Sequence, residues 1–237
     1  MERRIFRIKE TIATVIAEEK YLPVAETEIM RQRGYLEGFI ELDPFFRLTF
    51  EPYPCPPSAP GIVKRMCEAS EKAGVGPMAA VAGAIAEAAV EAMVEAGAEH
   101  AIVENGGDIA MHLSSPVTVG IFTGESSIKD IGFKVEPSGG IIGICTSSGT
   151  IGPSISLGTA DAATVVSKSV SLADAAATAL GNAIKSDEKK HIDDVMNGFK
   201  MDGIDGILVI THSHMGIRGA VPKIIKSRVD YDLISKG

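Results

Sequence analysis

The chain has 237 residues, which fits one large domain or two small ones and is long enough to bury a substantial core. Its net charge of −8 argues against a nucleic-acid-binding surface, because binding to phosphate backbones requires an excess of Lys and Arg. Aromatic residues make up 5% and Trp is absent, which disfavours base-stacking platforms for single-stranded nucleic acid.

The most apolar segments predict neither a signal peptide nor a membrane span. Charged residues interrupt the apolar residues near the amino terminus. The most apolar run, Met78–Val103, carries glutamates that would be costly in lipid. The cysteines lack the spacing of a metal site, so we expect free thiols in a cytoplasmic protein: Cys55, Cys67 and Cys145.

The first 60 residues are expected to form a layer that precedes the body of the protein. Residues 3–17 indicate two short strands with a hairpin turn near residue 9. Helical spacing of apolar residues predicts a helix over Val24–Ile40, and Phe45–Phe50 is typical of a strand. The five prolines of Pro52–Pro60 exclude regular structure there. We therefore expect a single domain with an N-terminal elaboration at 1–52, a proline-rich linker at 53–60 and a body at 61–237.

A short helix over Gly61–Ala73 and an alanine-rich helix over Met78–Ala96 are expected next, since alanine has the highest helix propensity. Gly83 lowers that propensity, which suggests that a strand or a ligand approaches the helix there. Gly97 is placed to end the helix. Three glutamates recur every four residues and predict a solvent-exposed stripe: Glu87, Glu91 and Glu95.

The remainder of the chain alternates short apolar runs with Gly, Pro and Ser, which is typical of many short strands. The order of elements is not a regular strand–helix alternation and no GxGxxG follows a strand, so a Rossmann fold is disfavoured. We predict an α+β fold with antiparallel or mixed sheets layered on alanine-rich helices. The expected strands are His100–Val103, Ile109–Leu113, Val117–Phe122, Ile131–Val135, Ile141–Cys145, Ala162–Val166, Ile204–Ile210 and a hairpin arm in Ile217–Ile225, and the expected helices are Leu172–Ile184 and Asp187–Phe199.

The segment Asn105-Gly106-Gly107-Asp108 lies between two apolar runs and has two interpretations. Asn-Gly is a strong signal for a hairpin turn. Adjacent glycines would also let the backbone approach a ligand, with the flanking Asn and Asp side chains offering polar contacts.

The segment Ser171–Asp174 has the form of a capping box, with Ser171 as the N-cap. Thr178 lies four residues after Asp174 and so on the same helical face. A carboxylate and neutral oxygens suit Mg²⁺ when a ligand phosphate is also present. The phosphate matters here, because a helix N-terminus repels a lone cation and attracts an anion.

The segment Thr146-Ser147-Ser148-Gly149 could hold a phosphate through amides and hydroxyls, or it could simply be a loop. His212 and His214 would share a face of a strand, but no third ligand follows at a recognisable spacing. We therefore interpret them as ordinary histidines.

Taken in order, these segments resemble the motifs of the ApbE superfamily, the FAD:protein FMN transferases. That family has an N-x-GGD-type loop, then a T-S-G loop, and later an A-D-x-x-x-T motif that opens a helix, and the match covers residues 75–185. The resemblance implies an ApbE-like fold that binds a small phosphorylated ligand, FAD or FMN, together with Mg²⁺. It assigns metal binding to Asp174 and Thr178, and cofactor binding to Gly83, Asn105, Gly106, Gly107, Asp108, Thr146, Ser147, Ser148 and Gly149.

Two departures from the family pattern argue against transfer of FMN to a target protein. The helix motif G-x-x-A-K-G aligns with Met78–Gly83, where Ala82 replaces the lysine. The H-x-x-D-P-x-T-G segment has no counterpart between Gly149 and Val165, a stretch without His or Asp-Pro. In the family these groups serve flavin recognition. The chain therefore resembles a branch of the superfamily that lacks part of the transferase motifs.

Two alternatives stay open beside ligand binding with Mg²⁺. Cys145 precedes a flexible loop whose amides could stabilise a thiolate, which would suit a sulfur-handling protein, although a buried cysteine at a strand end is the simpler explanation. The chain could also be a non-catalytic binding or assembly protein that keeps the fold. The small-residue faces of the helices suit packing within one subunit or across a homodimer.

Overall fold

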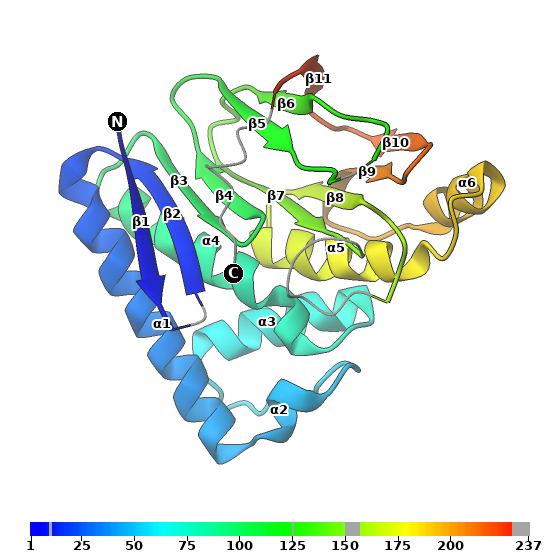
Figure 1. The fold of residues 1–237 in the computed structure, drawn as a ribbon. Coiled ribbons are helices and arrows are strands. Elements are labelled where there is room, and N and C mark those ends of the chain that lie inside the picture. The colour runs from blue at the N-terminus through cyan, green and yellow to red at the C-terminus, as the bar shows by residue number, and fades with distance from the viewer. Residues whose placement is uncertain (10, 125, 150–156, 229–237) are drawn as a thin grey trace.

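The computed structural model describes residues 1–9, 11–124, 126–149 and 157–228, and in them two sheets and a layer of helices are stacked (Figure 1). The larger sheet has eight strands in the order β1-β2-β3-β4-β7-β8-β9-β10, and the smaller has the order β11-β6-β5. The strand pairs of the described residues are all antiparallel. This architecture confirms the predicted α+β class.

The strands of the larger sheet are β1 (Glu2–Ile8), β2 (Thr11–Ala17), β3 (Ala101–Asn105), β4 (Asp108–His112), β7 (Ile141–Ser147), β8 (Ala162–Ser167), β9 (Ile204–Ile210) and β10 (Met215–Gly219). Those of the smaller sheet are β5 (Val117–Ile121), β6 (Ile131–Val135) and β11 (Lys223–Lys226). The helices are η1 (Glu19–Tyr21), α1 (Leu22–Leu42), α2 (Phe45–Leu48), α3 (Gly61–Ala73), η2 (Pro77–Ala80), α4 (Val81–Glu95), α5 (Val170–Ala183) and α6 (Lys189–Gly198).

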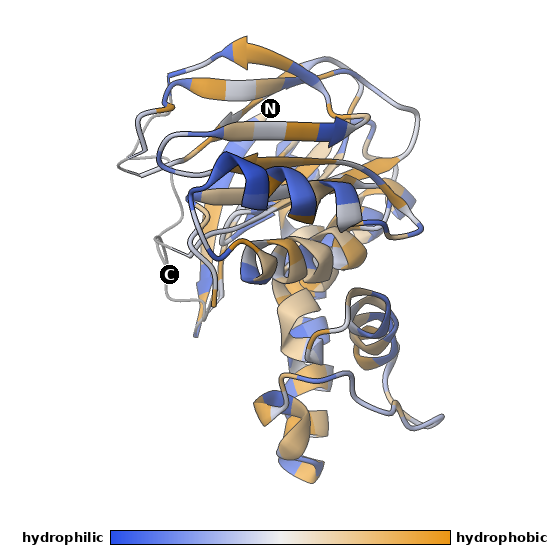
Figure 2. Cartoon of the chain, turned by 90° about the vertical axis from the view of Figure 1, so that its right-hand side faces the viewer, coloured by the Kyte–Doolittle hydropathy of each residue, from blue (hydrophilic) through white to orange (hydrophobic). Residues whose placement is uncertain are grey.

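The two faces of the larger sheet are buried against different partners. Alternate residues such as Val103 and Cys145 belong to the core shared with the helices, whereas their neighbours Ile102 and Ile144 belong to a second core shared with β5 and β6. This two-residue period follows from the pleat of a strand. Helices α4 and α5 contact the sheet on the first face. Figure 2 shows that α6 is largely hydrophilic, in contrast to the apolar α5.

Most of the predicted elements are present, and two differ. Phe45–Leu48 is a helical turn and not a strand, because Phe46 is fully buried there while the Asp43 carboxylate caps the amide of Phe45. Ile217–Ile225 is not one hairpin arm. Its first part, β10, pairs with β9, and its last part, β11, joins the smaller sheet beside β6.

The proline-rich segment has no helix or strand, as expected, but it packs against the protein. Tyr53 and Cys55 contact the main core, and the Tyr53 hydroxyl donates a 2.6 Å hydrogen bond to Asp43. All three cysteines are free thiols. The segment is therefore anchored to the body along its length and not only at its ends.

The continuous helical segment Pro77–Glu95 is long and apolar enough to cross a membrane by length and composition alone. Of its most apolar window, 61% is buried inside the protein. It contacts α1, α5 and strands β3 and β4. This is the environment of a core helix.

A matched pair of methionines tests the core. Met93 on α4 is fully buried, whereas Met30 on α1 is 55% exposed. Met93→Ala should lower the free energy of unfolding by about 2–5 kcal/mol, because it removes buried apolar volume and leaves a cavity. Met30→Ala should change it by less than about 0.5 kcal/mol. Urea unfolding monitored by circular dichroism measures both, and equal losses would contradict the packing described.

Candidate functional site

The predicted motifs meet where the β3–β4 hairpin, the end of β7 and helix α5 approach the start of α4. Asn105 ends β3 and Asp108 begins β4, so only Gly106 and Gly107 form the turn. Both glycines have positive φ, at 67° and 103°, as a tight hairpin turn requires. The hairpin interpretation of this segment is therefore confirmed.

Two side chains from distant elements hold the start of α4. The Asn105 amide donates to the carbonyl of Ala82 at 3.1 Å, and the Gly83 amide donates to Oδ2 of Asp174 at 2.8 Å. A Cβ at position 83 would lie 2.7 Å from the carbonyl oxygen of Val170. Gly83 therefore permits a close approach, as predicted, but the approaching element is helix α5 and not a strand or a ligand.

Asp108 and Asp174 form a buried pair of carboxyl groups beneath the hairpin turn. Burial raises the pKa of Asp174 to about 7, although the amides of Gly83 and Ala82 oppose the shift. Burial, and then the charge of Asp174, raise the pKa of Asp108 well above its usual range. Both side chains are less than a tenth exposed. Without a cation, this pair therefore retains protons that exposed aspartates would have lost.

The segment Thr146–Gly149 lies beside this pair. Thr146 and Ser147 are the last residues of β7, and only Ser148 and Gly149 begin the following loop, so half of the predicted loop is strand. The Thr146 hydroxyl shares a 2.9 Å hydrogen bond with Thr164, and the carbonyl of Thr146 faces Gly107. The loop continues into residues 150–156, which lie outside the described part of the chain.

Helix α5 begins two residues earlier than the predicted capping box requires. Its N-cap is Ser169, whose hydroxyl accepts from the amide of Leu172 at 3.4 Å. Ser171 lies inside the first turn, and Asp174 is the fifth helical residue. The capping-box prediction is therefore wrong, since Asp174 is too far along the helix and bonds to α4 instead. Thr178 follows one turn later and is half-buried.

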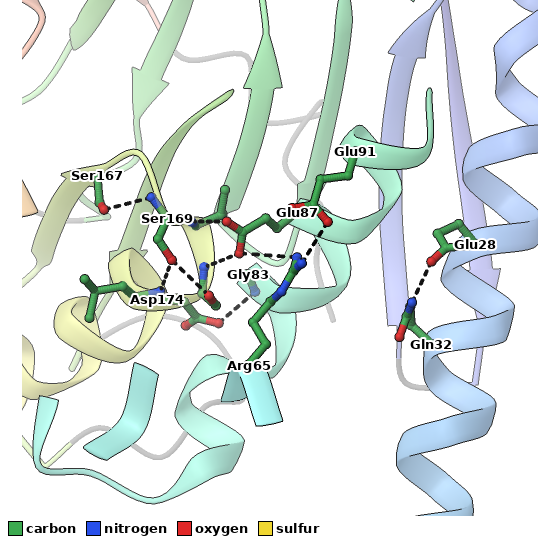
Figure 3. A network of polar contacts seen from close by, with 12 residues as sticks. Glu28, Gln32, Arg65, Gly83, Glu87, Glu91, Ser167, Ser169 and Asp174 are labelled. Atoms are coloured by element: carbon green, nitrogen blue, oxygen red, sulfur yellow. Dashed lines mark hydrogen bonds and ion pairs between the residues drawn. The ribbon is translucent and has the colours of Figure 1, made fainter. Parts of the chain in front are cut away.

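Glu87 caps α5 from another helix, a role that the sequence did not indicate. Its two carboxylate oxygens accept from the amides of Val170 and Ser171, each at 3.1 Å (Figure 3). A carboxylate suits this position because the N-terminus of a helix has unpaired amides and a partial positive charge. The exposed-stripe prediction is thus wrong for Glu87, which is buried, and right for Glu95. The 83 positions between Glu87 and Val170 explain why no local motif showed it.

Arg65 of α3 extends this network to the surface. Its guanidinium lies 3.7 Å from Glu87 and 2.9 Å from Glu91 (Figure 3). Three helices, α3, α4 and α5, are therefore connected by one polar network next to the Gly83–Asp174 contact.

The structure opposes the thiol-dependent alternative. Cys145 is fully buried and its thiol donates to the carbonyl of Val170 at 3.5 Å. Burial and the nearby Asp108 and Asp174 raise the pKa of this thiol well above its usual range. A reactive cysteine needs a positive, accessible environment, which is the reverse of what Cys145 has.

His212 and His214 have separate contacts in the structure. His214 contacts Asp187 through Nδ1 at 3.3 Å, and His212 contributes its backbone carbonyl to Ser127. Within the described residues, no group of three His, Cys, Asp or Glu side chains is placed to hold a metal ion.

We predict that Glu87→Ala lowers the free energy of unfolding by about 2–4 kcal/mol, because it leaves two buried amides of α5 without an acceptor. Glu87→Gln keeps one acceptor oxygen and should lose less. Glu91→Gln is the matched control, since it breaks only a half-exposed ion pair worth up to about 1 kcal/mol. Chemical denaturation distinguishes the three, and a Glu87→Ala variant as stable as Glu91→Gln would contradict the capping role.

The raised pKa of Asp174 predicts an unusual pH dependence of stability. Between about pH 4 and 7 the folded chain keeps this proton and the unfolded chain has released it. The contribution of Asp174 to the free energy of unfolding should therefore fall as the pH rises through this window, and then level off. Asp174→Asn keeps an acceptor for the Gly83 amide but cannot ionise, so it should flatten the dependence.

The measurement is urea unfolding of both proteins at pH 5 and pH 8 in the presence of a chelator. Asp193→Asn on α6, an exposed aspartate paired with Lys189, should keep the wild-type dependence. A wild-type protein that gains stability relative to Asp174→Asn as the pH rises would contradict the prediction.

Comparison with known proteins places this geometry in a family. The family model described as AbpE bacteria matches residues 8–197. The UPF0280 proteins of Methanocella arvoryzae and Methanothrix thermoacetophila are each 52% identical, covering 98% and 100% of this chain and 94% and 100% of their own. That of Archaeoglobus fulgidus is 44% identical over the full length of both chains.

The solved structures agree at the level of the fold. The flavin transferase ApbE from Vibrio cholerae has a TM-score of 0.61 and 15% identity, covering 92% of this chain and 96% of that one. The ApbE protein from Thermotoga maritima has a TM-score of 0.52 and 12% identity over all of both chains. The chain therefore belongs to the AbpE bacteria family together with the UPF0280 proteins, and it has the ApbE-like α+β fold.

Proposed function

We propose that this protein binds a small phosphorylated ligand, with a flavin nucleotide as the first candidate, together with Mg²⁺. The binding region is the motif corner, defined as Asn105–Asp108, Thr146–Gly149, Asp174 and Thr178. The supporting observation is that Asn105 of the β3–β4 hairpin and Asp174 of α5 both bond to the start of α4, and that the carbonyl of Thr146 at the end of β7 faces the hairpin turn at Gly107. The solved ApbE structure from Vibrio cholerae, which has the same fold, is named as a flavin transferase.

The chemistry of the donors fits a magnesium ion. Asp108 and Asp174 are buried carboxyl groups, and neither has an ion pair with Lys or Arg among the described residues. Mg²⁺ prefers such oxygen ligands and usually keeps several waters, binding through one or two carboxylates and a ligand phosphate. A site of three protein side chains is therefore not required. Asp174 and Thr178, with Asp108, would hold the ion, which would neutralise the charge of the carboxylates and the phosphate.

Asp174, Ser147 and Ser148 of the motif corner have defined parts in this proposal. Asp174 accepts the Gly83 amide through Oδ2, which fixes the carboxylate, and Oδ1 is the oxygen that we assign to the cation. Asp174 must lose its proton to bind the cation, and we therefore expect binding to weaken below about pH 7. Ser147 and Ser148 are half-buried at the end of β7 and offer hydroxyl donors to a phosphate.

The proposal is for binding without transfer of FMN. Ala82 stands where the transferase motif has a lysine, and its backbone carbonyl is held by Asn105. A methyl group cannot supply the ammonium that a lysine offers to a phosphate. The proposed protein therefore binds a ligand with Mg²⁺ but catalyses no transfer, so it is a binding protein that keeps the fold of the transferases.

Isothermal titration calorimetry with FAD, FMN and ADP, each with Mg²⁺ or with a chelator, tests the proposal. We expect one of these nucleotides to bind in the presence of Mg²⁺ and to bind at least about tenfold more weakly with the chelator. Asp174→Asn and Thr178→Val should weaken binding in Mg²⁺ by a similar factor and have little effect with the chelator.

Asp193→Asn serves as the control, because it removes an exposed carboxylate of α6 and leaves the motif corner intact. The proposal fails if wild-type protein binds none of the three nucleotides. The role given to the metal fails if Asp174→Asn binds as well as wild type in Mg²⁺.

A further inference from the structure

At the end of the molecule opposite the smaller sheet, α1 ends and α2 follows (Figure 1), and four large apolar side chains of this region, which we call the tip patch, are exposed. Phe45 and Leu48 lie three residues apart and so on one side of α2. Large apolar side chains at this density on the surface are a feature of interaction sites. The members of the patch and their exposed fractions are Leu42 86%, Phe45 61%, Leu48 69% and Phe50 68%.

The tip patch rests on a packed support. Phe46 is fully buried, with edge-to-face contacts to Phe39 and Tyr53 at ring-centroid distances of 5.1 Å each. A Cβ at Gly76 would lie 2.9 Å from the Cα of Phe50, so the chain after α2 lies directly on the start of η2. The apolar side chains are therefore presented by a preformed surface, which lowers the entropy lost on association.

The area of the tip patch is large enough for association with the same patch of a second copy of the chain. Complete burial of one aromatic side chain removes about 150–250 Å² from water, so the four partly exposed side chains offer on the order of 500 Å². Two copies joined through the patch would bury on the order of 1,000 Å² from these side chains alone, which is near the lower limit for a specific interface.

The charges around the patch are self-complementary. Arg47 is exposed between Phe45 and Leu48, and Glu41 and Glu51 are exposed at its edges. A two-fold axis brings the same patch of both copies together, so that a basic group of one copy can face an acidic group of the other. The acidic edges and the net charge of −8 disfavour an anionic membrane as the occupant.

We propose that the tip patch is the contact surface of a two-fold homodimer. The small-residue faces of α4 and α5, which the sequence offered as another dimer surface, pack against each other within the chain at Gly83 and Asp174. The tip patch shares no residue with the motif corner.

Sedimentation velocity over a concentration range of about 1 to 100 μM tests the proposal, with a dissociation constant expected in the micromolar range. Wild-type protein should sediment as a dimer at the upper end. Phe45→Glu/Leu48→Glu should remain monomeric there with an unchanged melting temperature, since both side chains are already exposed to water. Met215→Glu, at a 44% exposed position on β10, is the matched control and should dimerise like wild type.

Arg47→Glu is a second variant that removes no apolar contact, and it should weaken the dimer by at least about tenfold. The proposal is overturned if wild type is monomeric at the highest concentration, or if the Phe45→Glu/Leu48→Glu protein still dimerises. Binding of monomeric wild type to phosphatidylcholine vesicles through the same residues would also overturn it, by assigning the patch to a lipid surface.

Discussion

The contact between α4 and α5 is the interaction on which the candidate site depends. Gly83 lets the backbones approach, Asp174 accepts the amide of Gly83, and Glu87 closes the open N-terminus of α5. These bonds involve charged or ionisable groups out of water, where each is stronger than at a surface and costly to leave unmade. They fix α5 against β7, so that Asp174 is set close to Asp108 at the hairpin.

The same contact gives the site its electrostatic character. Because Asp174 lies between two helices and close to Asp108, it is dehydrated and near another acid. The result is a pair of carboxyl groups that hold protons in the absence of a cation, next to backbone and hydroxyl groups at the end of β7. Cys145 is part of this apolar environment, which explains why it behaves as a buried core residue.

The local motifs of the site were predicted well where one short segment determines its own conformation. The hairpin at Gly106 and Gly107 needs positive φ at two successive positions, a constraint that is visible in the sequence. Gly83 also indicated that another segment approaches α4 closely, since a glycine inside an alanine-rich helix is otherwise unfavourable. The predicted N-cap of α5 was wrong because Ser169 and Ser171 are equally suitable N-caps by sequence. Only Glu87, from a helix far away in sequence, distinguishes them, since it accepts the amide of Ser171 and so places this residue inside the helix.

The sequence by itself determined the α+β class, most helices and strands, and membership of the ApbE-like superfamily, because periodicity and ordered motifs are local properties. The tertiary structure decided which contacts the residues of those motifs make within the protein. It buried Glu87 and Cys145, made a helical turn of Phe45–Leu48 around the buried Phe46, and divided Ile217–Ile225 between two sheets. These outcomes depend on packing between segments far apart in the chain, and such packing overrides local propensity.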